Sequence, residues 1–252
     1  MDRVVNNDRV VGIIQARIGS TRLPAKILAP IVGSLPLIAV LVERIRPASI
    51  PLWLATTKTK HDDVTAAWGE ELALNVFRGD EDDVLSRFAA IVAETNPTWV
   101  VRFTADDPFT DAAITTRALE LAMSATDHVD LLTAGPSRQF PLGYAPQVVR
   151  ATAISQLDRT LPEQGTHHRV HVTSGIEASR IATIQDPTLP ARPGWRWTVD
   201  TLEDMAMAQA AFAAASEHGI RTQYGEFVSI LDERSDITAI NGSVRQKVLD
   251  DG

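Results

Sequence analysis

The chain has 252 residues, no cysteine and a formal net charge of −8. This acidic balance argues against nucleic-acid binding through a broadly basic face, and the lack of cysteine excludes disulfides, thiolate metal sites and a cysteine nucleophile. The first residues lack the apolar core of a signal peptide, and no run approaches the ~20 apolar residues of a membrane-spanning helix. We therefore expect a cytoplasmic protein that engages neither nucleic acid nor a membrane.

In the first half of the chain, short apolar runs alternate with longer amphipathic segments. The runs predict strands and the segments predict helices, an alternation that indicates βαβ crossovers. The expected fold is therefore α/β and Rossmann-like, with a mostly parallel sheet and helices on both faces. The predicted strands are Val10–Gln15, Leu52–Thr56, Asn75–Phe77 and Trp99–Phe103, and the predicted helices are Leu37–Arg46, Asp63–Ala73, Asp82–Glu94 and Asp111–Ser124.

The pattern loosens after Leu131, where turn residues become frequent. Asp200 or Thr201 can cap a final long helix. From Glu226 we expect a short apolar stretch and a frayed polar end. The further predictions are strands at Gln147–Val149 and Ile181–Ile184 and helices at Ala151–Thr160, His167–Ile176 and Leu202–His218.

The segment from Ile13 to Lys26, IIQARIGSTRLPAK, follows the first predicted strand. Its small-residue loop carries Arg17, Arg22 and Lys26, although the chain as a whole is acidic. Arginine forks suit phosphate oxygens, lysine acts as a point charge, and Gly19 lets backbone N–H groups approach closely. The pattern indicates a nucleoside triphosphate site; the alternative is a strand-to-helix connection with solvated cations. Neither GxxxxGK[ST] nor GxGxxG occurs, which argues against a P-loop NTPase and a dinucleotide dehydrogenase.

Two aspartates, Asp106 and Asp200, follow predicted core strands. Ligands of open α/β sheets bind at the carboxyl ends of the strands, where the cationic loop also lies. Mg²⁺ prefers oxygen ligands and takes one or two carboxylates together with phosphate and water. The sequence therefore predicts that both carboxylates meet the loop across a bound triphosphate, although either aspartate alone could be a helix cap or a turn residue.

These motifs resemble those of the cytidylyltransferase family of spore-coat polysaccharide biosynthesis proteins, which is related to the CMP-sugar synthetases. Members carry Gln-Ala-Arg, Gly-Ser-Thr-Arg-Leu-Pro and a lysine, as residues 15–26 do here. The resemblance covers essentially the whole chain. It departs at Ala25, where glycine is usual, and at Asp107, where the family has cysteine. Further matching segments are Phe77–Leu85, Thr104–Pro108 and Trp197–Thr201.

The resemblance implies a nucleotide-diphospho-sugar transferase fold and a Mg²⁺-dependent cytidylyltransferase that uses CTP and releases pyrophosphate. It implies that Arg17, Arg22 and Lys26 are catalytic and that Asp106 and Asp200 hold the metal. It also implies a homodimer. The nucleotide-binding candidates are Gln15, Ala16, Gly19, Ser20, Thr56, Thr57, Arg78, Gly79, Asp80 and Val84.

We expect a single domain over residues 1–252. About 10–130 would bind the nucleotide, about 131–225 would bind the acceptor and form the dimer, and 226–252 would be a tail. In the middle part, Pro141–Val148 and Arg169–Thr173 lack four acids that the family commonly carries. Losing acids lowers repulsion against an anionic substrate, so we expect an anionic acceptor such as an acidic sugar, a phosphonate or a phosphorylated polyol. The acceptor-binding candidates are Arg138, Tyr144, Gln147, His168, Arg169 and His171.

Other interpretations stay open. The histidines near His168 could equally begin a solvated helix, and zinc is rejected because adjacent histidines cannot easily converge on one ion without cysteine ligands. The enzyme could prefer another base, or transfer sugar from a finished nucleotide sugar. A protein that binds nucleotide without turning it over is the third possibility, because the acceptor half is altered.

Overall fold

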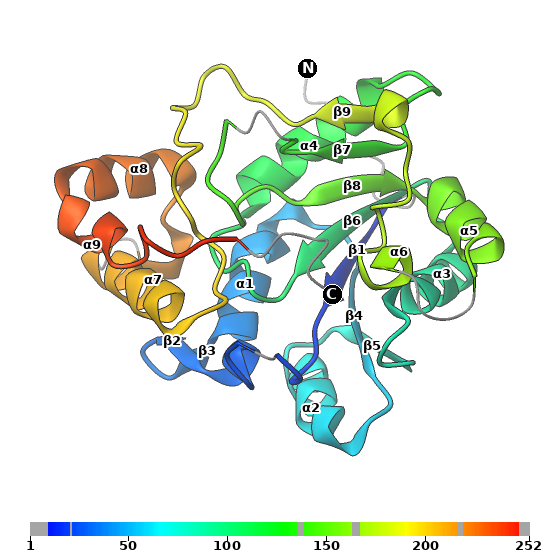
Figure 1. Cartoon of the computed structure of the whole chain (residues 1–252), viewed down its shortest axis with the longest axis horizontal. Helices are drawn as coiled ribbons and strands as arrows, with labels where there is room; N and C mark the ends of the chain where they lie inside the picture. Colours follow the sequence, from blue (N-terminus) through cyan, green and yellow to red (C-terminus); the bar gives the residue numbers. More distant parts are fainter. Residues whose placement is uncertain (1–9, 21, 136–138, 163–166, 216–218, 247–252) are drawn as a thin grey trace.

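The fold is built on a seven-stranded mixed sheet in the order β5-β4-β1-β6-β8-β7-β9. The computed structural model describes residues 10–20, 22–135, 139–162, 167–215 and 219–246 (Figure 1). Every neighbouring pair is parallel except the two that involve β8, which runs antiparallel to β6 and β7. The strands are β1 (Val10–Gln15), β4 (Leu52–Thr57), β5 (Asn75–Gly79), β6 (Trp99–Thr104), β7 (Leu131–Thr133), β8 (Gln147–Arg150) and β9 (Ile181–Thr183).

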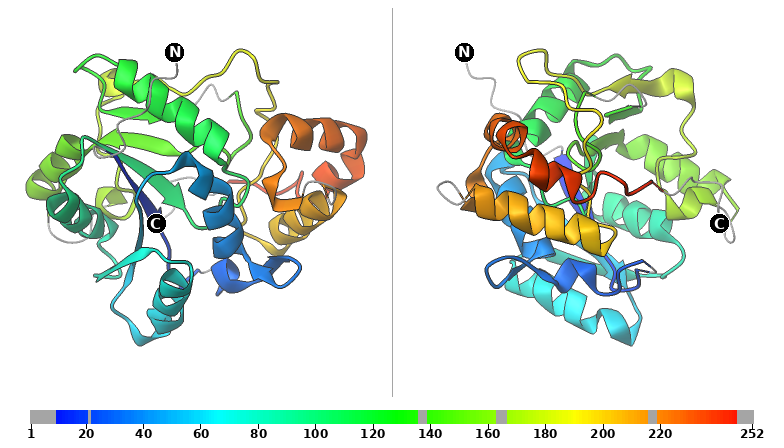
Figure 2. Two further views of the ribbon diagram at one scale, coloured as in Figure 1. Left: turned by 180° about the vertical axis from the view of Figure 1, so that it is seen from behind. Right: turned by 60° about the vertical axis from the view of Figure 1, so that its left-hand side comes forward.

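Helices cover both faces of the sheet because its strands are apolar on both sides. In β1, Ile14 belongs to one buried cluster and Ile13 to the other, as alternation along a strand requires. One face packs against α1 and α4, the opposite face against α3 and α5 (Figure 2), and α7, α8 and α9 form a helical group beside α1 (Figure 1). The helices are α1 (Leu37–Ile45), α2 (Asp63–Glu71), α3 (Val84–Thr95), α4 (Ala112–Ser124), α5 (Ala151–Thr160), α6 (His167–Val170), α7 (Leu202–Ala214), α8 (Tyr224–Glu233) and α9 (Ser235–Ala239).

The α/β class and the mostly parallel sheet are confirmed, and the elements of the first half lie within a few residues of their predicted bounds. Three of the described strands were not predicted: β7 and the short hairpin of β2 (Pro30–Val32) and β3 (Leu35–Pro36). These strands have two or three residues, too few to show a periodic pattern.

Three predictions for the second half need correction. The helix expected over His167–Ile176 is limited to α6, because Val172 adopts φ 47°, a left-handed conformation that a helix cannot contain. The segment from Glu226 is largely helical, in α8 and α9, rather than a frayed end. The last long helix ends at Ala214, and His218 lies outside the described residues. Within the described ranges no helix is both long and apolar enough to cross a lipid bilayer.

Candidate active site

The cationic loop after β1 folds back on itself and is fixed by a buried carboxylate. The Ala25 amide donates to the carbonyl of Ile18 at 3.1 Å, and the Ile18 amide donates to Asp62 Oδ1 at 2.8 Å. Asp62 also accepts from the hydroxyls of Thr57 and Thr65. The loop is therefore tied to the carboxyl end of β4 and to α2.

At the end of this loop a left-handed residue turns the chain so that Lys26 points inward. Ala25 has φ 57° and ψ 17° and precedes a short 3₁₀ turn, Lys26–Leu28. Lys26 is buried, although lysine is almost never fully buried unless it is paired. The position at which the related family carries glycine is thus one where a side chain is strained.

Lys26 meets both aspartates. Its Nζ lies 2.6 Å from Asp106 Oδ2 and 2.8 Å from Asp200 Oδ1, and Arg22 lies 2.9 Å from Asp200 Oδ2. Burial opposes the charge of Lys26, but the attraction of the two carboxylates raises its pKa above the ordinary value. Burial likewise disfavours ionised Asp200, but Lys26, Arg22 and Arg196 together lower its pKa.

Asp200 is held in place by a buried network at the start of α7. Arg196 lies 2.7 Å from Asp200 Oδ2 and 2.9 Å from Asp204 Oδ1. Asp204 accepts from the backbone amides of Asp200 and Thr201 and from the amide of Asn241, and it completes a capping box with Thr201. The orientation of the Asp200 carboxylate is therefore set by the helix terminus.

The loop that carries Asp106 is joined to the segment before Asp200 through the backbone. The Val199 amide donates to the carbonyl of Asp106 at 2.8 Å. Gly143, with φ 89°, packs so closely that a Cβ atom there would lie 2.6 Å from the Thr198 nitrogen and from Asp107 Oδ1. Only glycine allows the segment around residue 143 to lie against both aspartate loops.

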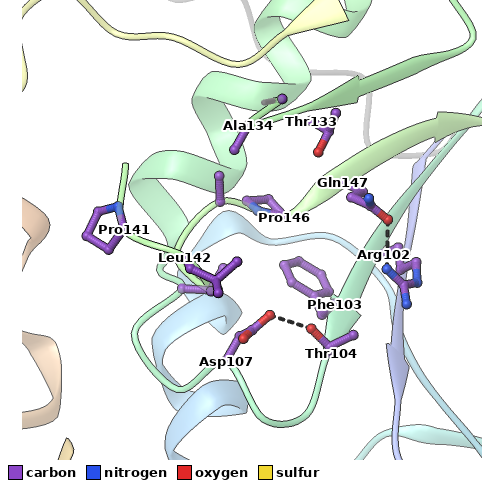
Figure 3. A pocket seen from close by; sticks show the side chains of 14 residues that line it. Arg102, Phe103, Thr104, Asp107, Thr133, Ala134, Pro141, Leu142, Pro146 and Gln147 are labelled. Atoms are coloured by element: carbon purple, nitrogen blue, oxygen red, sulfur yellow. Dashed lines mark hydrogen bonds between the residues drawn. The ribbon is translucent and has the colours of Figure 1, made fainter. Parts of the chain in front are cut away.

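A cavity of about 270 Å³ opens beside Asp106 and is lined by β6, the loop after it, and residues 133–135, 141–143 and 145–147 (Figure 3). Its charged lining residues are Arg102 and Asp107. Arg102 donates to the side-chain oxygens of Gln15 and Gln147, and burial lowers its pKa. Asp107 accepts from the Thr104 hydroxyl; burial, with the nearby charge of Asp106, raises the pKa of Asp107 to about 7. The cavity therefore offers a cation, a carboxylate and an amide next to the aspartate pair.

The carboxylates of the site suit a metal ion that takes few protein ligands. Among the described residues, no group of three or more His, Cys, Asp or Glu side chains could hold a metal. Mg²⁺ needs fewer, because it usually takes one or two carboxylates and completes its shell with water and substrate phosphate. Asp106 and Asp200, which bind the same lysine nitrogen, fit Mg²⁺ brought together with a triphosphate. The three histidines at 167–171 do not form a zinc site.

The predicted nucleotide residues lie near the carboxyl ends of β1, β4 and β5, but some of their side chains are paired or buried within the protein. Arg78 donates to the carbonyls of Thr57 and Thr59 and pairs with Asp63. Thr56 is buried and its hydroxyl has no hydrogen-bond partner among the described residues. The Val84 side chain is part of the core, so only its backbone is available to a ligand.

Arg17, which was predicted to be catalytic, and the nucleotide candidates Gly19, Ser20 and Asp80 are more open. Arg17 is exposed, with one nitrogen 3.7 Å from Glu81, and Asp80 accepts from two backbone amides in the turn before α3. Ser20 accepts from the Leu23 amide. Of the other predicted residues at this edge, Gln15 is half-buried, and Ala16 and Gly79 are buried.

Several predicted acceptor residues are engaged elsewhere, and these assignments are corrected. Tyr144 is fully buried and donates its hydroxyl to Asp111, so it does not line the cavity. Arg169 is buried in ion pairs with Asp83 and Asp158, which fasten α6 to α3 and α5. A residue expected to bind substrate is structural in both cases, because its polar atoms already have partners within the fold.

Of the other acceptor candidates that the structure describes, only Gln147 lines the cavity. His168 bonds the Ser174 hydroxyl, and burial, followed by the nearby charges of His167 and Arg102, lowers the pKa of His171. Arg138 lies outside the described residues.

Four residues of the site were missed by the sequence reading: Asp62, Arg102, Arg196 and Asp204. A signal existed for Arg102 and Arg196, because each is a charged residue between large apolar ones, in Val-Arg-Phe and Trp-Arg-Trp. Charged side chains in apolar runs are rarely buried without a partner or a function. Asp62 and Asp204 gave no such signal, because acids at helix starts are common.

Comparisons with known proteins agree with this geometry. A family profile described as cytidylyltransferase matches residues 11–135. The spore coat polysaccharide biosynthesis protein SpsF of Bacillus subtilis is 30% identical over 237 residues, which cover 90% of this chain and 95% of that protein.

Solved structures share the fold, among them the following two. One, a cytidylyltransferase from Leptospira borgpetersenii, has a TM-score of 0.83 and 23% identity over 95% of this chain and 98% of that chain. The other, CMP:2-keto-3-deoxy-manno-octonic acid synthetase complexed with CTP, has a TM-score of 0.58 and 21% identity over 82% of this chain and 99% of that chain. By its sequence and its fold, the chain belongs to the cytidylyltransferase family.

Proposed function

We propose that the chain is a Mg²⁺-dependent cytidylyltransferase that transfers CMP from CTP to a small anionic acceptor and releases pyrophosphate. The observation that carries this proposal is the contact of Lys26 with both Asp106 and Asp200 at the carboxyl edge of the sheet. This arrangement gives a triphosphate its cations and a divalent metal its carboxylates at one place. A glycosyltransferase that uses a finished nucleotide sugar releases no pyrophosphate, so the product separates the two activities.

In this proposal the chain acts mainly by positioning and by electrostatic stabilisation, as is general for phosphoryl transfer. The acceptor oxygen forms a bond to the α-phosphorus while the bond from that phosphorus to the bridging oxygen of pyrophosphate breaks. Arg17, Arg22 and Lys26 offset the charge that develops on the leaving pyrophosphate. Mg²⁺ held by Asp106 and Asp200 would supply further neutralisation at the α-phosphate.

The acceptor is assigned to the cavity that contains Arg102 (Figure 3). An arginine has five N–H donors, and three hydrogen bonds of Arg102 go to the neutral amide oxygens of Gln15 and Gln147. Among the described residues, no carboxylate forms a salt bridge with it. Asp107 and Asp106 attract the guanidinium without forming a salt bridge to it, and its two remaining donors favour an anionic group of the acceptor.

The identity of the attacking atom determines whether a base is needed. A phosphate or phosphonate oxygen is already ionised and needs none. A sugar hydroxyl has to give up its proton, and Asp107 is the carboxylate that lines the cavity. Both acceptor types therefore belong in the test.

The proposal is tested by pyrophosphate release from CTP with a panel of acidic sugars, phosphonates and polyol phosphates, at constant Mg²⁺. Release with CTP, and not with UTP, GTP or ATP, in the presence of one of these acceptors is the expected result. Equal release with another nucleotide would contradict the base preference. Binding of CTP without turnover of any acceptor, under conditions that support a homologous enzyme, would favour a non-catalytic nucleotide-binding protein.

A homodimer is also proposed, supported by the resemblance to the family. Light scattering of the purified chain at several concentrations is the direct measurement. A monomeric mass at all concentrations would contradict it.

A further inference from the structure

The groups proposed to bind the two halves of the substrate complex are already bound to one another. Lys26 and Arg22 are proposed for the triphosphate, and Asp106 and Asp200 for the metal. In the structure Lys26 joins both carboxylates, and Arg22 lies on Asp200. Two of the three ammonium hydrogens of Lys26 already go to these carboxylates, so phosphate oxygens compete with the carboxylates for the lysine.

Three of the four carboxylate oxygens of Asp106 and Asp200 are in contact with cations. Lys26 Nζ takes one oxygen of Asp106 and Oδ1 of Asp200, and Arg22 and Arg196 share Oδ2 of Asp200. The Lys26 side chain is only 9% exposed. A divalent ion that enters this place without nucleotide has to displace a buried ammonium group from both of its carboxylate partners. Leaving a buried charge unpaired costs several kcal/mol.

A triphosphate removes this obstacle, because it offers Lys26 and Arg22 new anionic partners. We infer that Lys26 takes the place of the metal in the nucleotide-free protein, and that CTP binding transfers Lys26 and Arg22 to the phosphates and so opens Asp106 and Asp200 to the divalent ion. Metal binding therefore follows nucleotide binding. This inference rests on the proposed function, since it assumes that the same residues bind triphosphate and metal.

One cation stays on Asp200 throughout the exchange. Arg196 is buried, and its guanidinium is also fixed by Asp204 and by Gln246. Arg22 is much more exposed, at 37%, and is free to follow the phosphates. The pair of Arg196 and Asp204 therefore preserves the direction of the Asp200 carboxylate while Lys26 and Arg22 change partners.

The test is a Mn²⁺ titration of the full-length protein followed by electron paramagnetic resonance, with and without α,β-methylene CTP, which cannot release pyrophosphate. For the wild type we expect weak Mn²⁺ binding alone, and binding at least about tenfold tighter with the analogue, a typical size for coupling between two ligands. Lys26→Met should bind Mn²⁺ about tenfold more tightly than the wild type without nucleotide. Lys60→Met, which removes an exposed lysine, is the matched control and should behave like the wild type.

A second variant covers the case in which Lys26→Met folds poorly. Lys26→Arg keeps a cation between the carboxylates, so its nucleotide-free Mn²⁺ affinity should stay as weak as that of the wild type. Circular dichroism and thermal unfolding show which variants retain the fold. Tight nucleotide-free binding by Lys26→Arg would overturn the inference.

Asp106→Asn separates this inference from the proposed function. If it abolishes Mn²⁺ binding with the analogue, while folded Lys26→Met binds Mn²⁺ no better than the wild type without nucleotide, the exchange is wrong and the metal assignment stands. If Asp106→Asn changes Mn²⁺ binding in no state, the metal assignment fails and the inference fails with it.

Discussion

The Nζ atom of Lys26 lies 2.6 Å from Oδ2 of Asp106, although the two residues are 80 positions apart in the chain. Parallel pairing of β1 with β6 places the segments that follow these strands at the same edge of the sheet. The contact thus connects the cationic loop to the proposed metal site.

Lys26→Ala and Asp106→Ala should each abolish turnover, which we expect to mean a loss of at least about 100-fold in kcat, the size found when one electrostatic contact to a transition state is removed. The measurement is pyrophosphate release from CTP, with circular dichroism to show that the fold remains. Lys60→Ala, which removes an exposed lysine, serves as the control. Near-normal turnover by a folded Lys26→Ala or Asp106→Ala would contradict the site.

Arg102→Met should weaken the binding of the acceptor more than the binding of the nucleotide. Without the guanidinium, the anionic group loses its cation in the cavity, so KM for the acceptor should rise by about tenfold or more, equivalent to about 1.4 kcal/mol. KM for CTP should change much less. Arg117→Met, on the exposed side of α4, is the control. A larger rise in the KM for CTP than in the KM for the acceptor would show that Arg102 belongs to the nucleotide site.

Asp204→Ala should destabilise the protein strongly and disturb Asp200. Asp204 is fully buried and pairs with Arg196, and removing one partner of a buried ion pair costs about 3–5 kcal/mol. Urea unfolding measures the loss in the free energy of unfolding. The control is Asp236→Ala, which breaks an exposed pair with Arg234 and should leave the stability within the error of the measurement. Similar stabilities for both variants would show that the network does not hold α7.

The only two tyrosines of the sequence should ionise at unusually high pH. Burial raises the pKa of Tyr224 to about 12 and that of Tyr144 well above the ordinary value. Since the unfolded chain releases these protons near pH 10, the stabilisation is complete below that pH and is lost as the pH rises towards the folded pKa values. Tyr224→Phe should therefore lose stability less steeply above pH 10.

Tyrosinate absorbance during an alkaline titration, with and without urea, measures this difference. Little tyrosinate should form in the folded protein at pH 10, where about half forms in urea. Equal titration curves in the two conditions would show that neither hydroxyl is protected by the fold.

Ala25→Gly should stabilise the protein slightly. Ala25 has φ 57°, a conformation that costs a residue with a Cβ about 1–2 kcal/mol and glycine almost nothing. The greater flexibility of glycine in the unfolded chain offsets part of the gain, so a net increase of roughly 0.5 kcal/mol is expected in urea unfolding. Ala29→Gly provides a control of opposite sign, because Ala29 has φ −72° and glycine there only adds unfolded-state entropy. A loss of stability in Ala25→Gly would contradict the strain.

The sequence predicted the elements that leave a periodic signature. The apolar run of Val10–Gln15 predicted a buried strand, and in the structure its side chains alternate between two buried clusters. Short elements such as β7 could not be found in this way, because three residues do not establish a period. The break of the helix at Val172 was equally invisible, since a β-branched residue with positive φ contradicts its own local preference.

By itself the sequence determined which chemical groups are present and where each stands along a strand or a loop: the cations after β1 and the acids Asp106 and Asp200. Only the tertiary structure decided which of them meet. Lys26 binds Asp200 from a distance of 174 positions, whereas Tyr144 and Arg169 are buried on structural carboxylates. Local patterns encode strands and turns through period and conformation, but the partner of a buried polar group comes from whichever distant segment packs against it.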